Sequence, residues 1–261
     1  MKIAIIGFGE AGHMFGKGLS AQADVFAYDI NITPEMQLNA EAAHVSLSRD
    51  LSAALKDAQI VFSLVTADQA QCAARSAAPL LKGGQVYFEM NSVAPDTKRS
   101  NAALIPSLVD AAIMAPVYPK ELSVPLLLAH PDAQIKADKL CALGLNAMPA
   151  GDQIGDAAAI KMCRSIMIKG MEALTIECFL TARHYGVEDA VKASLQGSFP
   201  EMGWNKDRVD YWFERVSTHG KRRAAEMREA AKTVKNAKIP TQISFEIAKA
   251  HDIYHGILKS Q

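Results

Sequence analysis

Short apolar runs alternate with helix-like stretches over roughly the first 150 residues of the chain. Seven of these runs are predicted as strands, at 2–6, 24–29, 59–64, 85–89, 109–113, 124–128 and 145–148. Helical periodicity separates the first five, near 10–22, 34–42, 50–57 and 67–81. Because strands that alternate with helices of this length build βαβ units, the pattern predicts a doubly wound parallel sheet.

The pattern changes after residue 151. From Gly155 to about Tyr185 the chain has no proline and one internal glycine, Gly170, which predicts a single long helix. Further helical stretches are predicted from 187, from 205, from 219 to about 236, and after Pro240, with no convincing strand among them. The sequence therefore predicts an α/β domain over 1–153 and an all-α domain over 154–261.

A glycine-rich turn follows the first predicted strand. Gly7, Gly9 and Gly12 form G-x-G-x-x-G where that strand ends and a helical stretch begins. The first glycine allows a tight turn, the second lets a pyrophosphate approach the backbone, and the third lets the helix pack closely on the strand. A purely structural turn is the alternative. The residues expected to hold a dinucleotide here are Gly7, Phe8, Gly9, Glu10, Ala11 and Gly12.

Asp29 ends the second predicted strand, where the dinucleotide fingerprint places the acid that binds the adenosine ribose hydroxyls. A carboxylate there would repel a 2′-phosphate, and no Arg or Lys follows in 30–33. The sequence therefore favours NAD over NADP, although a turn at the strand end is the alternative role of Asp29. Further cofactor-binding candidates are Val65, Thr66 and Asn91.

Polar side chains form a stripe on the predicted long helix, which is otherwise rich in Ala, Met, Ile and Leu. At about 100° per residue, one face carries Lys161, Arg164, Ser165, Glu172 and Thr175. We expect the helix to be buried on several sides, with this stripe facing a solvated cleft or a partner.

Lys161 is the candidate catalytic residue of the stripe. Burial beside apolar walls and a second cation at Arg164 both disfavour the ammonium, so the pKa of Lys161 is expected to fall toward the range useful in proton transfer. Arg164 is expected to clasp the carboxylate of a small anionic substrate through two parallel hydrogen bonds. The alternative is a lysine that snorkels on an ordinary amphipathic helix.

Composition narrows the function classes. Twenty-eight Lys and Arg balance twenty-eight Asp and Glu, so no global charge favours nucleic acid or anionic lipid. No apolar stretch is long enough to span a bilayer and the N-terminus lacks a signal pattern, so we expect a cytoplasmic protein. Cys72, Cys141, Cys163 and Cys178 lack CxxC spacing, which favours reduced, mostly buried thiols and implies no metal site.

Four segments resemble the β-hydroxyacid dehydrogenase and 6-phosphogluconate dehydrogenase superfamily, in particular its shorter members with a compact helical C-terminal domain. They are the glycine turn at 7–12, Glu-Met-Asn-Ser-Val-Ala-Pro at 89–95, Lys-Met-Cys-Arg-Ser at 161–165, and Thr-His-Gly-Lys-Arg-Arg-Ala-Ala-Glu-Met at 218–227. The resemblance implies a Rossmann-type doubly wound sheet followed by an all-α C-terminal domain. The implied activity is NAD(P)-dependent oxidation of a CH–OH group in a small 3-hydroxy acid or sugar acid.

The resemblance also implies roles for individual residues. Asn91 and Ser92 would be catalytic residues near nicotinamide and substrate. Without the resemblance, their position before Pro95 predicts an N-cap for the helix near 95, and the two roles are compatible. Lys161 would be the general acid or base on the substrate oxygen. Loss of CO₂ could follow oxidation where a carboxylate sits β to the new ketone, which the sequence does not decide.

Two departures from the family pattern concern the substrate pocket. The usual Lys-x-x-Asn is Lys161-x-x-Arg164 here, with Ser165 next to it, which favours an anionic substrate. The family's Ser-Gly-Gly loop is Pro-Val-Tyr-Pro at 116–119, which presents the phenol of Tyr118. Two other functions stay open. One is an imine reductase, which the presence of Lys161 disfavours, and the other is a non-catalytic NAD(H)-binding sensor.

The segment 219–223 is a second candidate substrate site. His219 and Arg222 are expected to form an anion clamp that could reach the cleft of a partner subunit. The alternative is a solvent-facing cluster at the start of a helix, on the unfavourable end of its dipole. Trp204 and Trp212 are interpreted as core or interface aromatics, and the long apolar helix favours a homodimer.

Overall fold

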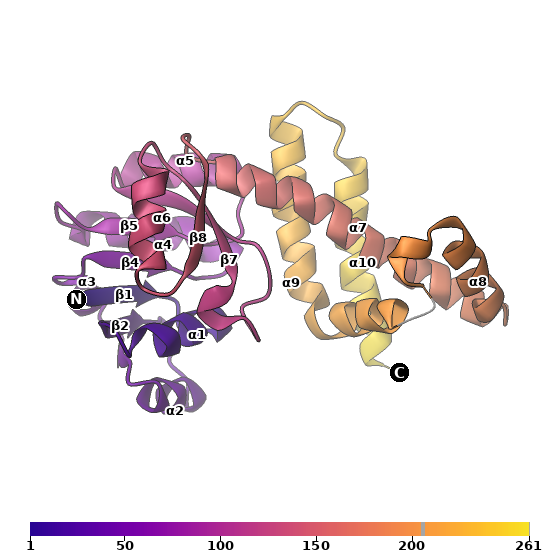
Figure 1. The fold of residues 1–261 in the computed structure, drawn as a ribbon, viewed down its shortest axis with the longest axis horizontal. Coiled ribbons are helices and arrows are strands. Elements are labelled where there is room, and N and C mark those ends of the chain that lie inside the picture. Colours follow the sequence, from indigo (N-terminus) through magenta and orange to yellow (C-terminus); the bar gives the residue numbers. More distant parts are fainter. Residues whose placement is uncertain (205–206, 261) are drawn as a thin grey trace. The chain divides into compact units, whose positions relative to one another are not determined.

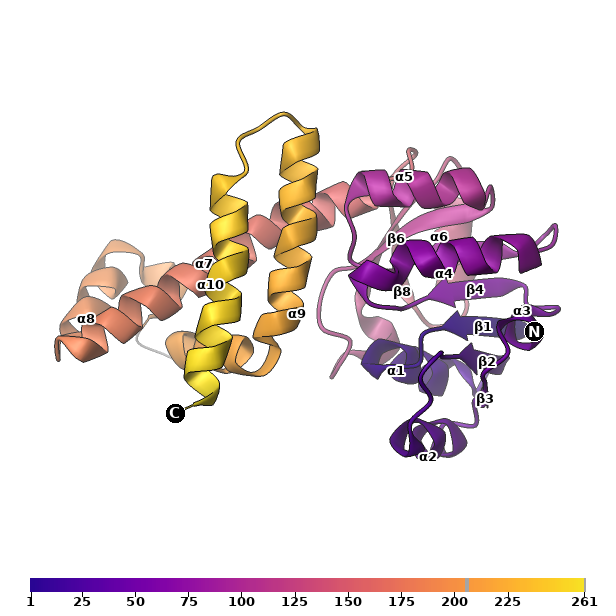
Figure 2. The same ribbon diagram turned by 180° about the vertical axis from the view of Figure 1, so that it is seen from behind.

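The computed structural model describes residues 1–204 and 207–260. The chain divides into two compact units, Met1–Lys161 and Met162–Gln261. In Figures 1 and 2 the first unit runs from indigo to rose and the second from rose to yellow. The predicted domain boundary between 153 and 154 lies just before helix α7 (Asp156–His184), whereas this division falls inside that helix.

The first unit, whose residues are all described, contains one eight-stranded sheet in the order β3-β2-β1-β4-β5-β6-β7-β8. Neighbouring strands are parallel except β6 and β7, which are antiparallel. The strand order changes direction between β1 and β4, where doubly wound sheets bind their ligands. The strands are β1 (Lys2–Ile6), β2 (Asp24–Tyr28), β3 (Ser46–Ser48), β4 (Ile60–Ser63), β5 (Val86–Glu89), β6 (Leu108–Ile113), β7 (Pro125–Ala129) and β8 (Asn146–Gly151).

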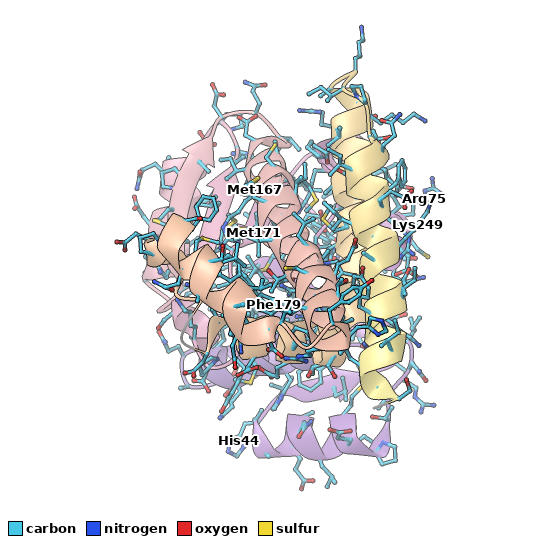
Figure 3. All side chains as sticks on the ribbon, turned by 90° about the vertical axis from the view of Figure 1, so that its right-hand side faces the viewer. His44, Arg75, Met167, Met171, Phe179 and Lys249 are labelled. Atoms are coloured by element: carbon cyan, nitrogen blue, oxygen red, sulfur yellow. The ribbon has the colours of Figure 1, made fainter. Side chains whose placement is uncertain are left out.

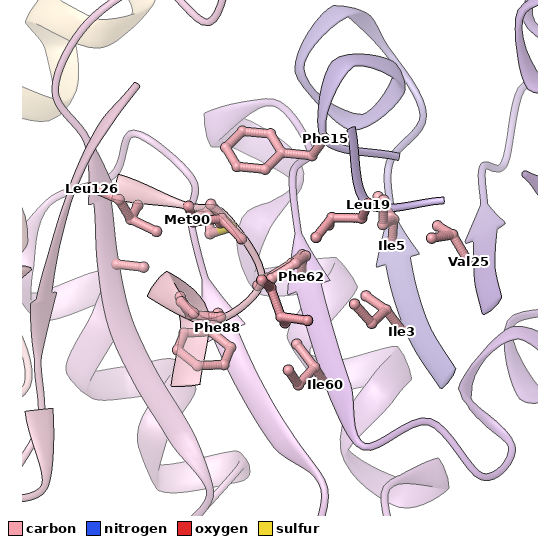
Figure 4. Close-up of a cluster of buried hydrophobic side chains, with 14 of the residues drawn as sticks. Ile3, Ile5, Phe15, Leu19, Val25, Ile60, Phe62, Phe88, Met90 and Leu126 are labelled. Carbon is pink, nitrogen blue, oxygen red and sulfur yellow. The ribbon is translucent and has the colours of Figure 1, made fainter. Parts of the chain in front are cut away.

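Helices cover both faces of this sheet (Figures 1 and 2). Ile3 and Ile5 pack on one face and Ala4 and Ile6 on the other, because successive side chains of a strand alternate. Figure 4 shows the larger core, in which Phe62 and Phe88 lie 5.6 Å apart by ring centroid. The first face carries α1 (Glu10–Leu19), α2 (Pro34–Ala42) and α6 (Ala133–Cys141), and the second carries α3 (Leu51–Leu55), α4 (Ala70–Ala77) and α5 (Pro95–Leu104).

Local sequence sets where several helices begin and end. The Thr33 hydroxyl accepts a hydrogen bond from the Met36 amide at 3.2 Å and so caps α2. The predicted helix at 67–81 is α4 flanked by two 3₁₀ turns, Ala67–Gln69 and Ala78–Leu80. Pro79 in the second turn cannot continue an α-helix. Strand β3 and helix α6 were not predicted, because three residues and a weakly amphipathic stretch give little periodicity.

The second unit is built from helices. It comprises α7 from Met162 onward, α8 (Glu188–Ser198), a 3₁₀ turn (Pro200–Met202), α9 (Arg208–Asn236) and α10 (Gln242–Lys259). Helices α9 and α10 lie side by side as an antiparallel pair (Figures 1 and 2). Gly220 allows this approach, since a Cβ there would lie 2.4 Å from the Cβ of His255. The described residues of this unit form no strand, so the prediction of a Rossmann-type sheet followed by an all-α domain is confirmed.

Two buried clusters hold the second unit together. Met162, Met227 and Ile247 bring α7, α9 and α10 into one core. Phe179, Trp204 and Trp212 form the other, and the two indole rings meet edge to face at 5.7 Å. The interpretation of Trp204 and Trp212 as core aromatics is therefore confirmed.

Helix α9 is longer than predicted. The stretches predicted from 205 and from 219 form one continuous helix. Gly220 does not interrupt this helix, because it is packed against α10. The predicted start at Asn205 lies outside the described residues. Since segment 219–223 lies in the middle of α9, its interpretation as a helix-start cluster is wrong. Among the described helices, none is long and apolar enough to cross a membrane.

Candidate active site

Several residues singled out from the sequence lie at the carboxyl ends of four neighbouring strands, β2, β1, β4 and β5. Asp29 directly follows β2 and Gly7 directly follows β1. Val65 and Asn91 come two residues after the ends of β4 and β5. This edge includes the point between β1 and β4 where the strand order changes direction.

The glycine turn leaves room for a ligand at one glycine only. Gly7 has a φ of +94°, and a Cβ there would lie 2.5 Å from the carbonyl oxygen of Leu64. A Cβ on Gly12 would lie 2.1 Å from the carbonyl oxygen of Gly7. Gly9, in contrast, has nothing within 4 Å of such a Cβ, and no side chain caps α1 there. An open backbone at an uncapped helix start fits a phosphate group.

Asp29 is tied to the glycine turn by hydrogen bonds. Its carboxylate accepts the backbone amide of Phe8 at 2.8 Å and that of Asn31 at 2.9 Å. The Asp29 side chain therefore stabilises the turn at the end of β2, which was the predicted alternative to ribose binding. It also puts a negative charge beside the glycine turn. Its contact with a ribose stays a prediction.

Asn91 is buried and connects two loops. Its Oδ1 accepts the backbone amide of Val65 at 2.7 Å, and its Nδ2 donates to Ser63 Oγ at 3.0 Å and to the Glu89 carboxylate. Both amide hydrogens of Asn91 are thus engaged within the protein itself. The predicted N-cap role of Asn91 and Ser92 is wrong, because the N-cap residue of α5 is Ala94 and no side chain caps that helix.

Lys161 reaches the loop after β5. Its Nζ donates a hydrogen bond to Ser92 Oγ at 2.6 Å, and both residues are half-buried. The contact lies within the first unit, of which Lys161 is the last residue. The structure therefore brings together two of the residues that the sequence predicted to be catalytic.

Three buried charged residues beside this loop were missed by the sequence reasoning. Lys98 of α5 lies 2.7 Å from the Glu89 carboxylate and 3.3 Å from that of Asp110. Asp110 also accepts the backbone amides of Gly155 and Ala158. The available signal was a carboxylate within or at the end of an apolar strand, since a buried charge requires a partner.

The remaining predicted substrate residues lie elsewhere in the chain. Arg164 and Arg222 are exposed in the second unit, and His219 is half-buried there. Ser165 is buried and accepts a hydrogen bond from Lys169 Nζ at 3.2 Å. Tyr118, in the first unit, is 67 % exposed. Their roles in substrate binding stay predictions.

One residue of the polar stripe of α7, Glu172, pairs with α9. Glu172 is 1 % exposed and binds the Arg223 guanidinium through both carboxylate oxygens. Lys169, which lies outside the stripe, also pairs with α9, since its Nζ lies 2.8 Å from the Glu226 carboxylate. Arg223 and Glu226 of the 218–227 segment therefore join two helices of the same chain, and the stripe does not line a solvated cleft at Glu172.

All four cysteines are free and exposed, so the expectation of mostly buried thiols is wrong. Cys163 and Cys178 lie on one side of α7 together with Met167 and Leu174, which are 64 % and 70 % exposed. We call these four residues the exposed stripe of α7. The described chain leaves this apolar side of the helix uncovered, which composition alone could not indicate.

Comparison with known proteins gives matches over both units. A family described as a domain of unknown function, DUF1932, matches residues 182–253. A conserved hypothetical protein from Sinorhizobium meliloti 1021 is 36 % identical, with a TM-score of 0.80 over 100 % of this chain and 90 % of its own. A protein of unknown function with structural similarity to 3-hydroxyacid dehydrogenases is 27 % identical, with a TM-score of 0.75 over 98 % of this chain and 97 % of its own.

More distant structures share the fold alone. A 3-hydroxyisobutyrate dehydrogenase from Mycobacterium tuberculosis, studied with L-serine, is 15 % identical, with a TM-score of 0.75 over 98 % of this chain and 93 % of its own. An imine reductase variant from Myxococcus stipitatus, in complex with NAD⁺, is 14 % identical, with a TM-score of 0.64 over 99 % of this chain and 92 % of its own.

These findings define the class as a Rossmann-type dehydrogenase fold with an α-helical C-terminal domain. The chain belongs to the β-hydroxyacid dehydrogenase and 6-phosphogluconate dehydrogenase superfamily, among the 3-hydroxyacid dehydrogenase-like proteins that carry a DUF1932 domain. The resemblance found in the sequence is confirmed.

Proposed function

We propose that this protein is an NAD(P)-dependent oxidoreductase that interconverts the hydroxyl group of a small 3-hydroxy acid or sugar acid with the corresponding ketone. The observation that carries the proposal is the 2.6 Å hydrogen bond from Lys161 Nζ to Ser92 Oγ. This contact supports the proposal, because the amine of Lys161 lies beside the loop after β5, in a sheet whose glycine turn fits a phosphate. Membership of the superfamily supports the same reaction class.

The sheet edge fits a nicotinamide dinucleotide. The glycine turn at 7–12 would hold the pyrophosphate, and Asp29 would bind the adenosine ribose and favour NAD over NADP. Val65, Thr66 and Asn91 would complete the binding surface at the neighbouring strand ends. When bound, the cofactor supplies the hydride acceptor for oxidation and the donor for reduction.

Lys161 would move the proton of the reacting hydroxyl. During oxidation its neutral amine accepts that proton while the carbonyl forms, and during reduction the ammonium returns it. Ser92, which accepts a hydrogen bond from the amine, would orient it. Arg164, three residues further along α7, would bind the substrate carboxylate, and the other candidate substrate contacts are Ser165, Tyr118, His219 and Arg222.

The first test measures the reduction of NAD and of NADP in the presence of small hydroxy acids and sugar acids. We expect turnover, faster with NAD, and a fall in kcat of about a hundredfold or more in Lys161→Ala, the usual range for loss of a general acid or base. NADH affinity should stay within about twofold, because the glycine turn is intact. Lys139→Ala, at an exposed lysine of α6, is the matched control.

Different results identify the other candidates. Activity that survives loss of Lys161 contradicts the proton-transfer role, and a preference for NADP contradicts the argument from Asp29. The fold likeness to an imine reductase makes imines the second substrate panel. A wild type that binds NADH but is inert with every hydroxy acid and imine would be a sensor.

We also propose that the chain forms a homodimer through the exposed stripe of α7. Figure 3 labels Met167 on this helix, one turn before Met171. Contiguous apolar surface of this kind is uncommon on monomers and marks association sites. A second copy offers the same surface, so the contact would be self-complementary.

A further inference from the structure

Glu89, Lys98 and Asp110 form a cluster of charges inside the first unit, which we call the buried charge cluster. Each of the three residues is at most 1 % exposed. Lys98 Nζ lies 2.7 Å from Glu89 and 3.3 Å from Asp110, and it also donates to the carbonyl oxygen of Ala111 at 3.0 Å. One ammonium therefore lies between two carboxylates from adjacent strands, β5 and β6.

One carboxylate of the cluster fixes the loop that carries Ser92. Glu89 accepts the backbone amide of Asn91 at 3.1 Å as well as its side-chain amide. Asn91 in turn accepts the Val65 amide at 2.7 Å. The position of Ser92, the next residue, therefore depends on Glu89.

The other carboxylate fixes the start of α7. Asp110 Oδ2 accepts the backbone amide of Gly155 at 3.0 Å and that of Ala158 at 3.1 Å. Amides in the first turn of a helix have no partner within the helix and carry the positive end of its dipole. Lys161 follows Ala158 by three residues, or about one helical turn. The position of Lys161 therefore depends on Asp110.

Both partners of the Lys161–Ser92 contact are thus tied to Lys98. We propose that the buried charge cluster is a positioning network that sets the distance between Lys161 Nζ and Ser92 Oγ. Glu89, Lys98 and Asp110 are its positioning residues and do not touch the reacting atoms. The expected effect on turnover rests on the proposed function, whereas the expected effect on geometry does not.

The charges explain why the network is sensitive to Lys98. Two carboxylates and one ammonium leave one uncompensated negative charge, which the N-terminal dipole of α7 offsets. Without the ammonium, the two buried carboxylates repel each other and separate. Because one is tied to the loop after β5 and the other to α7, their separation moves Ser92 away from Lys161.

The test uses Lys98→Met and the milder Asp110→Asn in the full-length protein, with Lys139→Met as the matched control. Each lysine is labelled with a limiting amount of acetic anhydride at fixed pH and quantified by mass spectrometry. We expect labelling of Lys161 to rise about tenfold in both cluster variants, as for loss of a charge-assisted hydrogen bond. The exposed Lys139 should react at an unchanged rate in both cluster variants, and Lys161 should be labelled as in the wild type in Lys139→Met.

Buried Lys169, in the second unit, reports on unfolding. Labelling of Lys161 that rises while labelling of Lys169 does not supports the proposal. Unchanged labelling of Lys161 in both variants overturns it, and so does an equal rise at Lys169 in both, because the cluster would then only stabilise the fold.

Turnover separates this proposal from the proposed function. If the wild type oxidises a hydroxy acid, both cluster variants should lower kcat by about a hundredfold with a smaller change in KM, since misplacement of a reacting group by about 1 Å has an effect of this size. An unchanged kcat overturns the positioning role. If the wild type is inactive, the proposed function fails, and the labelling of Lys161 still decides on the network.

Discussion

Gly9 and Gly12 lie three residues apart in one turn, but a methyl group would meet very different surroundings at each. Beside Gly9 there is open space, whereas beside Gly12 the Gly7 carbonyl oxygen would lie 2.1 Å away. The same motif therefore contains one glycine with open surroundings, which the proposed function assigns to the pyrophosphate, and one that the fold needs. The sequence could predict the packing role of Gly12 because the motif is local and its spacing reflects that role, whereas the ligand role of Gly9 stays a prediction.

This difference predicts two separable effects. Gly9→Ala should leave the thermal midpoint within a few degrees of the wild type and weaken NADH binding about tenfold or more, because the methyl group occupies the approach of the pyrophosphate. Gly12→Ala should lower the midpoint itself, since the helix must move away from the strand. Thermal scans and NADH titrations of both variants check this. A stable Gly12→Ala protein would contradict the packing argument.

At the scale of elements, α7 is held to its neighbours by pairs that lie far apart in sequence. Glu172 of α7 and Arg223 of α9 form a buried ion pair across 51 positions. The helical period predicted which residues of α7 share a face, but not what that face meets. Exposed cysteines, the continuous α9 and the buried charge cluster were missed for the same reason, because each depends on packing between elements.

Helix α10 contributes a buried histidine to this region. His251 is fully buried, and its Nε2 donates to the Lys169 carbonyl oxygen at 3.1 Å. Burial, together with the cations of Arg223 and Lys169, lowers the pKa of His251 from 6.5 to about 4, although the hydrogen bond to the Lys169 carbonyl oxygen and the charge of Asp252 act in the opposite direction. The Glu172 carboxylate lies 4.0 Å away.

The lowered pKa predicts a loss of stability in acid. Between pH 6.5 and about 4 the unfolded chain binds a proton at His251 that the folded chain does not bind. The contribution of neutral His251 to the free energy of unfolding is therefore complete above pH 6.5. It is lost as the pH falls through this window, and the loss is at most about 3 kcal/mol.

His251→Gln removes the titration and keeps a donor for the Lys169 carbonyl oxygen. Urea unfolding at pH 7 and pH 5, followed by the fluorescence of Trp204 and Trp212 in the same unit, measures the effect. The variant should lose less stability than the wild type between these two pH values. An equal loss of stability in the variant and the wild type would show that His251 has the same pKa in the folded and unfolded chain.

At the scale of the whole molecule, the chain combines a Rossmann-type unit with a helical unit whose apolar surface is incompletely covered. The alternation of strands and helices sufficed to predict the class of each unit. It could not predict assembly, because an apolar residue on a long helix can face its own chain or another one. The exposed stripe of α7 shows which residues face outward.

The stripe predicts a dimer that single charges can dissociate. Sedimentation equilibrium should give twice the chain mass of 28.1 kDa. Met167→Asp and Leu174→Asp should each raise the dissociation constant by about a hundredfold, as for the loss of a central interface residue. Leu38→Asp, at a residue of α2 that is 66 % exposed, should have no effect. A monomeric wild type would contradict the homodimer.

The hydrogen bonds of Asn91 have a consequence for the entropy of binding. Both hydrogens of its amide and its oxygen are already satisfied by Val65, Ser63 and Glu89. A small molecule that binds at this edge of the sheet therefore contacts the loop after β5, whose side-chain and backbone rotations are already restricted in the folded chain. Little conformational freedom remains to be lost at each encounter, so more of the contact energy is available for affinity.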